Sequence, residues 1–318
     1  MTRYILRRVA LSLVTLYLLA TMVFIIVNVL PDDPGRRIAG PFAPQEIVDS
    51  LNERLGVNDP LLDQYARLLR NVVTFDFGES FKFGQPVKEV MLPALGRSAK
   101  LVVLGFVLTV PISIAAGIFA ARRRNSFADR SVVTLGLASS SIPEFVSGVT
   151  LQFVIGVQLG WLPVLALAPS DAGLIGELRY LLLPALALVA VYFGYIARIT
   201  RAGTIMALDS DYTRTAVMKG LSGRRVLTRH VMRNALQPTV AVIGTQIGYL
   251  FSGLIGLELI FNYPGLGSLL VNAASDKDFP LLTAGVILVG VIYMLTTLTA
   301  DLIIAWMNPR SRLAGDRA

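Results

Sequence analysis

Six long apolar stretches, separated by polar segments, dominate the pattern along the chain. Each stretch is long enough for a helix to cross a hydrocarbon core of about 30 Å. Lipid-exposed backbone must hydrogen-bond within its own segment, and the alternating pattern of a transmembrane barrel strand is absent. The sequence therefore predicts an all-α polytopic membrane protein with six transmembrane helices, at residues 9–30, 101–121, 131–159, 180–197, 239–261 and 279–306.

The composition agrees with lipid as the main surroundings of the chain. Its 318 residues are 54% hydrophobic and 16% charged, and its mean hydropathy is +0.64. These values are too apolar for an ordinary soluble domain. The first stretch is longer than the apolar region of a signal peptide, and no small-x-small cleavage site precedes Pro31. We therefore expect it to be a retained span.

The net charge of +8 is distributed in a way that indicates orientation rather than nucleic-acid binding. Lys and Arg gather before the first span, in residues 122–130, in residues 198–233 and after Asn308, and they are sparse in the short loops between these segments. Short cytoplasmic loops of membrane proteins collect Lys and Arg. The pattern predicts a multi-pass membrane protein whose N- and C-termini are both cytoplasmic.

The long first loop, residues 32–98, is predicted to be a folded extracytoplasmic insertion. Pro44 can open a helix that Gly56 ends, and Asp59-Pro60 supplies a cap and first turn for a second amphipathic helix. The insertion is interpreted either as a small cap on the outer helix ends or as a part that contacts the solute. The predicted organisation is then a tail with the first span (1–31), the insertion (32–98), a transmembrane core (99–307) and a cytoplasmic tail (308–318).

Residues 201–237 form a second large hydrophilic stretch, predicted to be a cytoplasmic loop. Ser210 or Asp211 can cap a short helix that breaks at Gly220, and a second helix runs from about Ser222 toward Pro238. This is a helix, a turn and a helix at the membrane surface.

Small and apolar side chains lie within the first of these helices. Thr215 and Ala216 would let another protein approach closely, and Val217 and Leu221 offer apolar anchors among many Arg residues. By composition alone, the same segment also suits a basic amphipathic helix lying on anionic lipid headgroups. Both interpretations remain open on these grounds.

The chain resembles the permease subunits of bacterial binding-protein-dependent ABC importers, in particular those of the dipeptide and oligopeptide branch. Arg214-Thr215-Ala216 followed by Gly220 takes the place of the family's cytoplasmic motif, which is Glu-Ala-Ala, three residues and Gly, with Arg replacing the Glu. Further family-like blocks are Trp161-Leu162-Pro163, residues 258–267, Asp278-Phe279-Pro280 and Asn308-Pro309-Arg310.

The resemblance implies an ABC type I importer-like transmembrane domain that acts with other subunits. A second homologous permease subunit would complete the pathway, two ATP-binding subunits would bind ATP and Mg, and an extracytoplasmic substrate-binding protein would deliver short peptides. The residues expected to couple to the ATPase are Asp211, Arg214, Thr215, Ala216, Lys219, Gly220 and Leu221. The alternatives are another cargo, such as a nickel chelate, glutathione or an oligosaccharide, or an ion-driven secondary transporter.

The motifs of an enzyme are absent from the sequence. No Walker A sequence precedes any Lys, and no GxSxG, HExxH or paired-histidine constellation occurs. We therefore expect no catalytic residue, no metal site and no cofactor in this chain.

Four residues are candidates for the translocation pathway. Glu144 lies in an otherwise apolar span beside Pro143, which is expected to kink the helix, and a carboxylate there costs a few kcal/mol unless it faces water or a partner. It is either a pathway residue, for which a peptide's amino terminus is a plausible partner, or a helix-end or intersubunit carboxylate. The other candidates are Ser141, Tyr249 and Glu258, although Glu258 also suits a structural role at the turn formed by residues 263–265.

Overall fold

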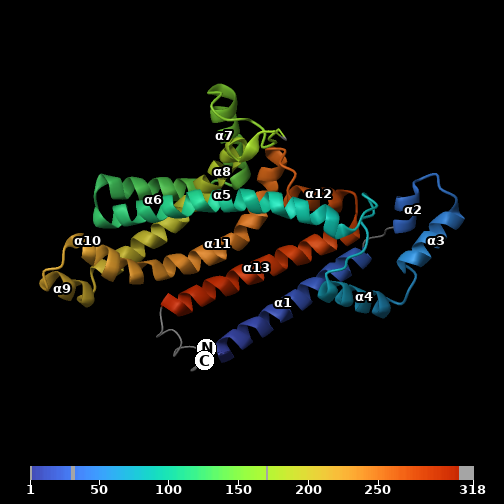
Figure 1. Ribbon diagram of the computed structural model, residues 1–318, viewed down its shortest axis with the longest axis horizontal. Helices are drawn as coiled ribbons and strands as arrows, with labels where there is room; N and C mark the ends of the chain where they lie inside the picture. Colours follow the sequence, from blue (N-terminus) through green and yellow to red (C-terminus); the bar gives the residue numbers. More distant parts are fainter. Residues whose placement is uncertain (1, 30–32, 170, 308–318) are drawn as a thin grey trace. The chain divides into compact units, whose positions relative to one another are not determined.

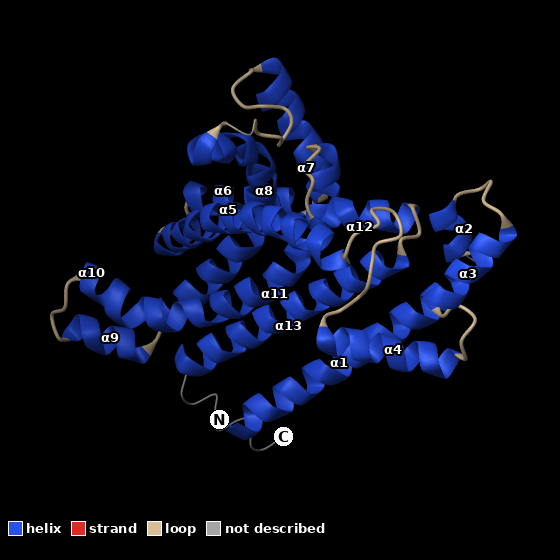
Figure 2. Ribbon diagram, turned by 45° about the vertical axis from the view of Figure 1, so that its right-hand side comes forward, coloured by secondary structure: helices blue, strands red, loops and turns tan. Residues whose placement is uncertain are grey.

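The computed structural model describes residues 2–29, 33–169 and 171–307 (Figure 1). Within that part, only the backbone is described for residues 2–5, 28–29, 247–252 and 304–307. The described residues fold into helices, without a strand beyond one isolated bridge between Glu79 and Pro86 (Figure 2). This confirms the all-α prediction. The predicted C-terminal tail, residues 308–318, lies outside the described residues.

The helices follow one another with short connections, and two of them are π-helical segments. Their bounds are α1 Thr2–Val29, α2 Pro34–Ala39, α3 Gln45–Leu55, α4 Leu61–Thr74, α5 Val87–Arg122, α6 Phe127–Ser140, α7 Glu144–Leu151, η1 Gln152–Gln158, α8 Gly173–Leu208, α9 Asp211–Met218, α10 Gly223–Arg225, η2 Val226–Val231, α11 Met232–Ile260, α12 Leu266–Ser275 and α13 Phe279–Met307.

Four helical segments of the described residues are long and apolar enough to cross a membrane. They are Leu6–Val27, Val87–Arg122, Gly173–Leu208 and Phe279–Ile303, and they match the predicted first, second, fourth and sixth spans. The predicted fifth span falls in α11, where the side chains of residues 247–252 are not described. The number of six spans therefore stays a prediction.

The predicted third span is not one continuous helix. It consists of α6 and the pair α7–η1, which are bent by 103° relative to each other. Pro143 disfavours the helical conformation of the residue before it and has no N–H to donate, so α6 ends at Ser140 and a new helix begins at Glu144. The expectation of a kinked single helix is therefore wrong, because the chain stops and restarts the helix here.

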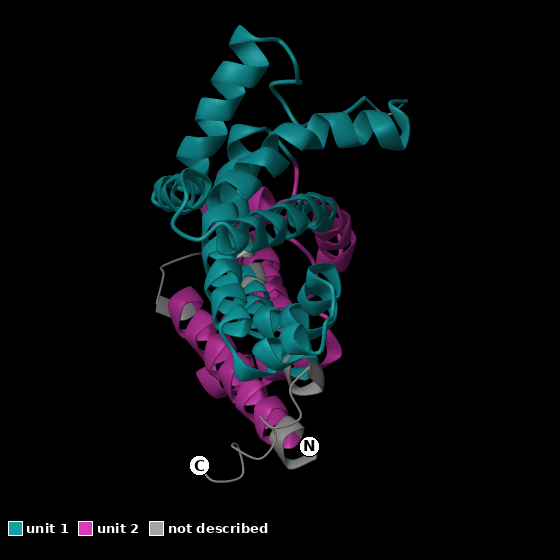
Figure 3. Ribbon diagram, turned by 90° about the vertical axis from the view of Figure 1, so that its left-hand side faces the viewer, with its two compact units in different colours: residues 1, 98–263, 295–318 teal, residues 2–97, 264–294 magenta. Residues whose placement is uncertain are grey.

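The chain divides into two compact units (Figure 3): residues 98–263 with 295–307, and residues 2–97 with 264–294. In the first unit, α8 packs against α6, α7 and α11. Its core contains fully buried large side chains from α8, from α11 and from the residue that follows α11, among them Leu183, Leu188, Leu257 and Phe261. At the crossing of α6 and α8, a Cβ on Gly194 would lie 1.8 Å from the carbonyl oxygen of Gly136. Only glycine lets these two backbones approach so closely.

A buried ion pair fixes the first end of α6 to α8. Asp129 lies in the first turn of α6, and its side chain is only 3% exposed. The guanidinium of Arg201 on α8 donates two hydrogen bonds to this carboxylate, one of them from Nη2 to Oδ2 at 2.7 Å. One residue earlier on α8, the hydroxyl of Thr200 forms a hydrogen bond of 3.1 Å with the hydroxyl of Thr239 on α11.

The second unit contains the insertion predicted outside the membrane. As predicted, α3 follows Pro44 and ends at Gly56, whose φ of 66° is the left-handed conformation that glycine tolerates. Asp59 does not cap α4, which is a correction: its carboxylate pairs with Arg67, and Pro60 precedes the helix without a side-chain cap. Hydrogen bonds from the N–H of Arg36 and the side chain of Asn52 lower the pKa of Asp33, which caps α2.

Contacts within the second unit tie the insertion to its longer helices. The hydroxyl of Tyr65 on α4 lies 2.6 Å from Oγ1 of Thr21 on α1. The fully buried carboxylate of Asp278, between α12 and α13, accepts hydrogen bonds from the hydroxyl of Ser80 and, at 3.2 Å, from the N–H of Lys82. Such contacts agree with a packed cap, while a role in contacting the solute stays untested.

Candidate functional site

The helix α9 is attached to the end of α8 by two hydroxyl groups. The last carbonyl groups of a helix have no intrahelical partner. Ser210 and Thr213 both donate hydrogen bonds to the carbonyl of Ala207, at 2.6 and 2.7 Å. Ser210 precedes α9 but makes no side-chain cap, because its hydroxyl is used on α8 instead. The start of α9 is therefore held by the preceding helix.

The end of α9 is a glycine turn with its hydrogen bonds made. Gly220 has a φ of 76°, its N–H donates to the carbonyl of Val217 at 2.9 Å, and the N–H of Leu221 donates to the carbonyl of Ala216 at 3.3 Å. These two bonds form a Schellman motif, in which the residue after the helix adopts the left-handed conformation. The predicted break at Gly220 is confirmed.

One face of α9 is buried within this chain. Ala216 is 4% exposed and belongs to a small apolar cluster with Ala207, Val226, Val231 and Ala235, against which Leu221 also packs. The expectation that Ala216 offers a small surface to another protein is therefore wrong. Its size matters because it lets α9 lie close to η2 and α8, and Leu221 is a packing residue rather than a free anchor.

The opposite face of α9 is exposed. It carries Asp211, Arg214 and Thr215 of the predicted coupling residues, and Lys219 and Gly220 are exposed at its end. Nη1 of Arg214 lies 3.9 Å from Oδ1 of Asp211, and the two side chains are 71% and 99% exposed. This ion pair therefore contributes little to stability.

Apolar side chains accompany these polar ones on the exposed side. Met218 is 80%, Val217 58% and Tyr212 42% exposed. Met218 and Tyr212 were not among the predicted coupling residues. A helical period of 3.6 residues places Met218 on the same face as Asp211, Arg214 and Thr215, so the sequence held that signal. The resulting surface joins large exposed apolar groups to charged ones, as a protein-docking patch does.

The predicted second helix after the turn is present, but it runs on past Pro238. It passes from α10 through η2 into α11, and Pro238 lies inside α11 instead of ending the helix. Arg224, Arg225, Arg229 and Arg233 are exposed along it. The interpretation that basic residues of this loop meet lipid headgroups stays open beside protein docking.

The break between α6 and α7 places two pathway candidates close together in the chain. Ser141 is exposed, and its hydroxyl donates to the carbonyl of Leu137 at 2.9 Å. Glu144 is half-buried at the first position of α7 and lies against α11, since a Cβ on Gly253 would be only 2.2 Å from its Oε1. No hydrogen bond or ion pair joins the Glu144 carboxylate to any described residue.

The other two pathway candidates differ from Glu144. Glu258 is fully buried in the first unit, and its carboxylate accepts a hydrogen bond from the hydroxyl of Ser98. Its carbonyl accepts from the N–H of Tyr263 at 2.7 Å, which fits the structural role at the turn. Tyr249 lies in α11, but its side chain is outside the described residues. The pathway role of both residues stays a prediction.

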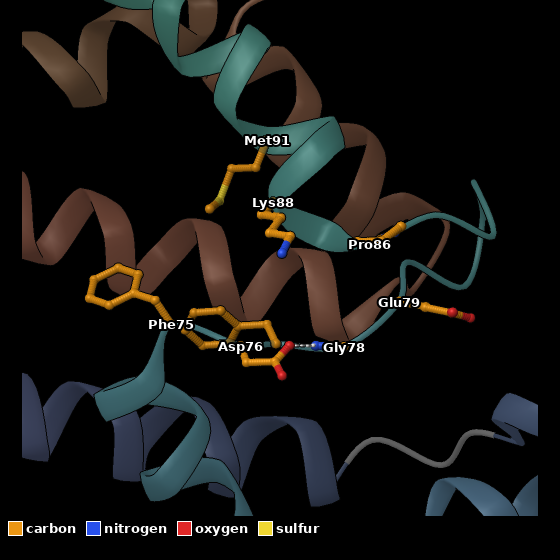
Figure 4. Close-up of a pocket in the computed structure, with 8 residues that line it drawn as sticks. Phe75, Asp76, Gly78, Glu79, Pro86, Lys88 and Met91 are labelled. Atoms are coloured by element: carbon orange, nitrogen blue, oxygen red, sulfur yellow. Dashed lines mark hydrogen bonds between the residues drawn. The ribbon is translucent and has the colours of Figure 1, made fainter.

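A cavity of about 270 Å³ lies in the second unit, away from any predicted site residue (Figure 4). Asp76, Glu79 and Lys88 bring charges of both signs to it, and the remaining lining residues are Phe75, Phe77, Gly78, Pro86 and Met91. The mixed charges favour no particular ligand. Over the described residues, no group of three or more His, Cys, Asp or Glu side chains is arranged to hold a metal ion.

Comparison with known proteins gives matches over both halves of the chain. A family model described as the inner membrane component of binding-protein-dependent transport systems matches residues 113–313. A companion model for the N-terminal part of such membrane components matches residues 1–108.

Individual relatives match over nearly their whole length. A protein of Sinorhizobium fredii described as a probable peptide ABC transporter permease is 34% identical over 309 residues, covering 97% of this chain and 99% of the relative. A glutathione transport system permease of Escherichia coli is 36% identical over 312 residues, covering 98% and 99%. A solved chain described as an amino acid ABC transporter with histidines aligns at 18% identity and a TM-score of 0.46, covering 70% of this chain and 94% of its own length.

Proposed function

Because this chain belongs to the peptide branch of the inner-membrane permeases of binding-protein-dependent ABC importers, we propose that it forms half of the translocation pathway of an importer for short peptides. Permeases of this family are multi-pass membrane proteins without catalytic activity, and separate subunits hydrolyse the ATP. The energy for transport must therefore enter this chain through a contact with another protein.

We assign that contact to the exposed face of α9. Its other face is packed against η2, and hydroxyl groups hold it to α8, so a force on α9 passes into these helices. Met218, Val217 and Tyr212 supply apolar surface, and full burial of such a side chain contributes about 1.5–3 kcal/mol. Closure of two ATP-binding subunits would move the α9 helices of two permeases together and rock the spans between two states.

The proposed complex has five subunits, of which this chain is one. A second homologous permease subunit completes the pathway. Each of two ATP-binding subunits receives the α9 helix of one permease, and an extracytoplasmic binding protein delivers the cargo. The termini and α9 lie on the cytoplasmic side of a bacterial inner membrane, with the excess of Lys and Arg in residues 198–233. ATP and Mg are bound by the partner subunits.

Short peptides are favoured as cargo by the relatives. One is described as a peptide permease and another as a glutathione permease, and glutathione is itself a tripeptide. Uptake by proteoliposomes containing the assembled complex tests this, with dipeptides, longer oligopeptides and glutathione competing against one labelled dipeptide. Glutathione as the only effective competitor would replace the broader peptide assignment.

Copurification tests the coupling contact. The chain lacks cysteine, so single cysteines can be placed on α9. A Thr215→Cys variant is expected to cross-link to an ATP-binding subunit, while an Ala216→Ser variant, altered on the buried face, keeps the complex intact. If gently extracted protein brings down no ATPase, and uptake persists without ATP in the presence of a proton gradient, the chain is an ion-driven transporter instead.

A further inference from the structure

The second candidate region, the break between α6 and α7, carries a carboxylate whose surroundings are unusual for a membrane span. Glu144 begins α7 directly after the 103° bend. α6 has 14 residues and is about 21 Å long at about 1.5 Å per residue, measured from its start beside the basic segment 122–130. A break at that distance lies inside a hydrocarbon core of about 30 Å. Glu144 is thus deep in the membrane rather than at its surface.

α7 begins with backbone N–H groups that have no partner within the helix. The N–H groups of Val146 and Ser147 donate to the carbonyl of Pro143 at 3.0 and 3.1 Å, so the N–H groups of Glu144 and Phe145 are left without helical partners. These groups make up the positive end of α7. A negative charge is favoured there, because the helix dipole stabilises an anion in the first turn.

Nothing in the described part of the chain neutralises the charge. Glu144 makes no hydrogen bond or ion pair with a described residue. The titratable group that interacts with it is the phenol of Tyr192, which has no positive form. A carboxylate without a partner at this depth is expensive unless water or a cation meets it.

The serine hydroxyls at the end of α6 offer hydrogen-bond acceptors to a partner. Ser139 and Ser140 donate their hydroxyl protons to the carbonyl of Gly136, at 3.2 and 2.7 Å, and Ser141 donates to Leu137 at 2.9 Å. Their hydroxyl oxygens therefore keep free lone pairs, and α6 ends here with the negative pole of its dipole. A primary ammonium group carries three N–H donors and one positive charge, which suits this combination.

We propose that the α6–α7 break is a recognition point in the translocation pathway, where the Glu144 carboxylate receives the terminal ammonium group of a passing peptide. This rests on the proposed function, because it takes short peptides as the cargo. Gly253 sets the position of the carboxylate: a side chain there would overlap Oε1 of Glu144, so glycine leaves room for the acid against α11.

Cysteine accessibility tests the surroundings of Glu144 independently of transport. Because the chain has no cysteine of its own, Glu144→Cys introduces a single thiol. A positively charged, membrane-impermeant methanethiosulfonate is expected to modify it at least about tenfold faster than the thiol of Phe145→Cys, the 53% exposed neighbour on the apolar side of α7. A free dipeptide should slow the modification.

Uptake by the reconstituted complex tests recognition. Glu144→Gln is expected to lower the initial rate of dipeptide uptake about tenfold, which corresponds to about 1.4 kcal/mol, and Glu144→Asp to restore part of it. Gly253→Ala should lower uptake as well. Gly256→Ala is the matched control on the same helix, because its Cβ would meet only Phe145 at an ordinary 3.4 Å, and it should leave uptake unchanged.

Each outcome decides the proposal. If the thiol at position 144 reacts in no nucleotide state, protein or lipid covers this position. The partner of the carboxylate is then a second permease subunit. A reactive thiol combined with full uptake by Glu144→Gln means a watery pathway without recognition. Both results overturn the proposal. If the unmodified complex shows no ATP-dependent uptake, the proposed function itself is contradicted, while the labelling result remains valid.

Discussion

The chain interrupts its helices at Gly220 and at Ile142-Pro143, and the two breaks are built in opposite ways. At Gly220, two hydrogen bonds close the turn, and Ala216 and Leu221 pack into an apolar cluster beneath it. At Pro143, the bend of 103° leaves Glu144 without a partner in the described residues. A break whose polar groups are satisfied within the chain makes a rigid shape for another protein to hold. A break with an unpaired charge needs something from outside the chain.

The comparison depends first on how firmly α6 is held before its break. The buried carboxylate of Asp129 is paired with Arg201, whose side chain is 25% exposed. Removing one partner of a completely buried pair costs about 3–5 kcal/mol, so the cost here is expected to lie below that range. Asp129→Asn should therefore lower the thermal unfolding midpoint of the purified complex strongly. Asp209→Asn, which breaks the exposed pair with Arg124, should change stability by less than about 1 kcal/mol. Equal effects of the two variants would mean that α6 is not anchored by Asp129.

A second test separates glycines needed for space from glycines needed for backbone conformation. Gly194→Ala forces a Cβ onto the carbonyl of Gly136, and overpacking of this kind costs about 1–3 kcal/mol. The same unfolding measurement on Gly96→Ala, where a Cβ meets nothing within 4 Å, should show no loss. A stable Gly194→Ala variant would show that α6 and α8 separate easily, which would weaken the contrast between a fixed and an open part of the third span.

Gly220 represents the conformational case. A Cβ there meets nothing within 4 Å, but the φ of 76° strains an L-residue by about 1–2 kcal/mol. Gly220→Ala should therefore reduce stability modestly and weaken ATP-dependent uptake, because the turn that orients α9 is strained. Gly220→Asn should cost less, since asparagine tolerates the left-handed conformation better. Gly220→Ala is therefore expected to be less stable than Gly220→Asn. The reverse order would exclude backbone strain as the cause.

The smallest effect on stability is expected on the exposed face of α9. Met218→Ala removes a side chain that is 80% exposed, so the free energy of unfolding should change by no more than about 0.5 kcal/mol. The amount of ATP-binding subunit that copurifies should nevertheless fall. As a control, Ala216→Leu overfills the buried cluster, so its first effect should be a lower free energy of unfolding. Unchanged copurification with Met218→Ala would place the docking surface elsewhere.

Several features could be predicted from residue patterns because their causes are local. Gly56 and Gly220 end helices where glycine tolerates a positive φ, and Pro44 precedes a helix as expected. Others depended on distant partners. The sequence predicts Asp59 as the cap of α4, but Arg67 takes its carboxylate. It predicts Ser210 or Asp211 as the cap of α9, but the carbonyl of Ala207 takes the hydroxyl of Ser210. A short polar side chain chooses among several partners, and the sequence does not show which one comes within reach.

The sequence by itself determined that this is a helical membrane protein and which family it resembles, because long apolar runs and ordered motif residues are properties of the chain alone. Only the tertiary structure decided that Ala216 faces inward while Met218 faces outward, and that Glu144 meets Gly253 without an ion-pair partner in the described chain. The physical reason is that burial and pairing depend on which helices come together, and η2, α8 and α11 reach these residues from elsewhere in the sequence.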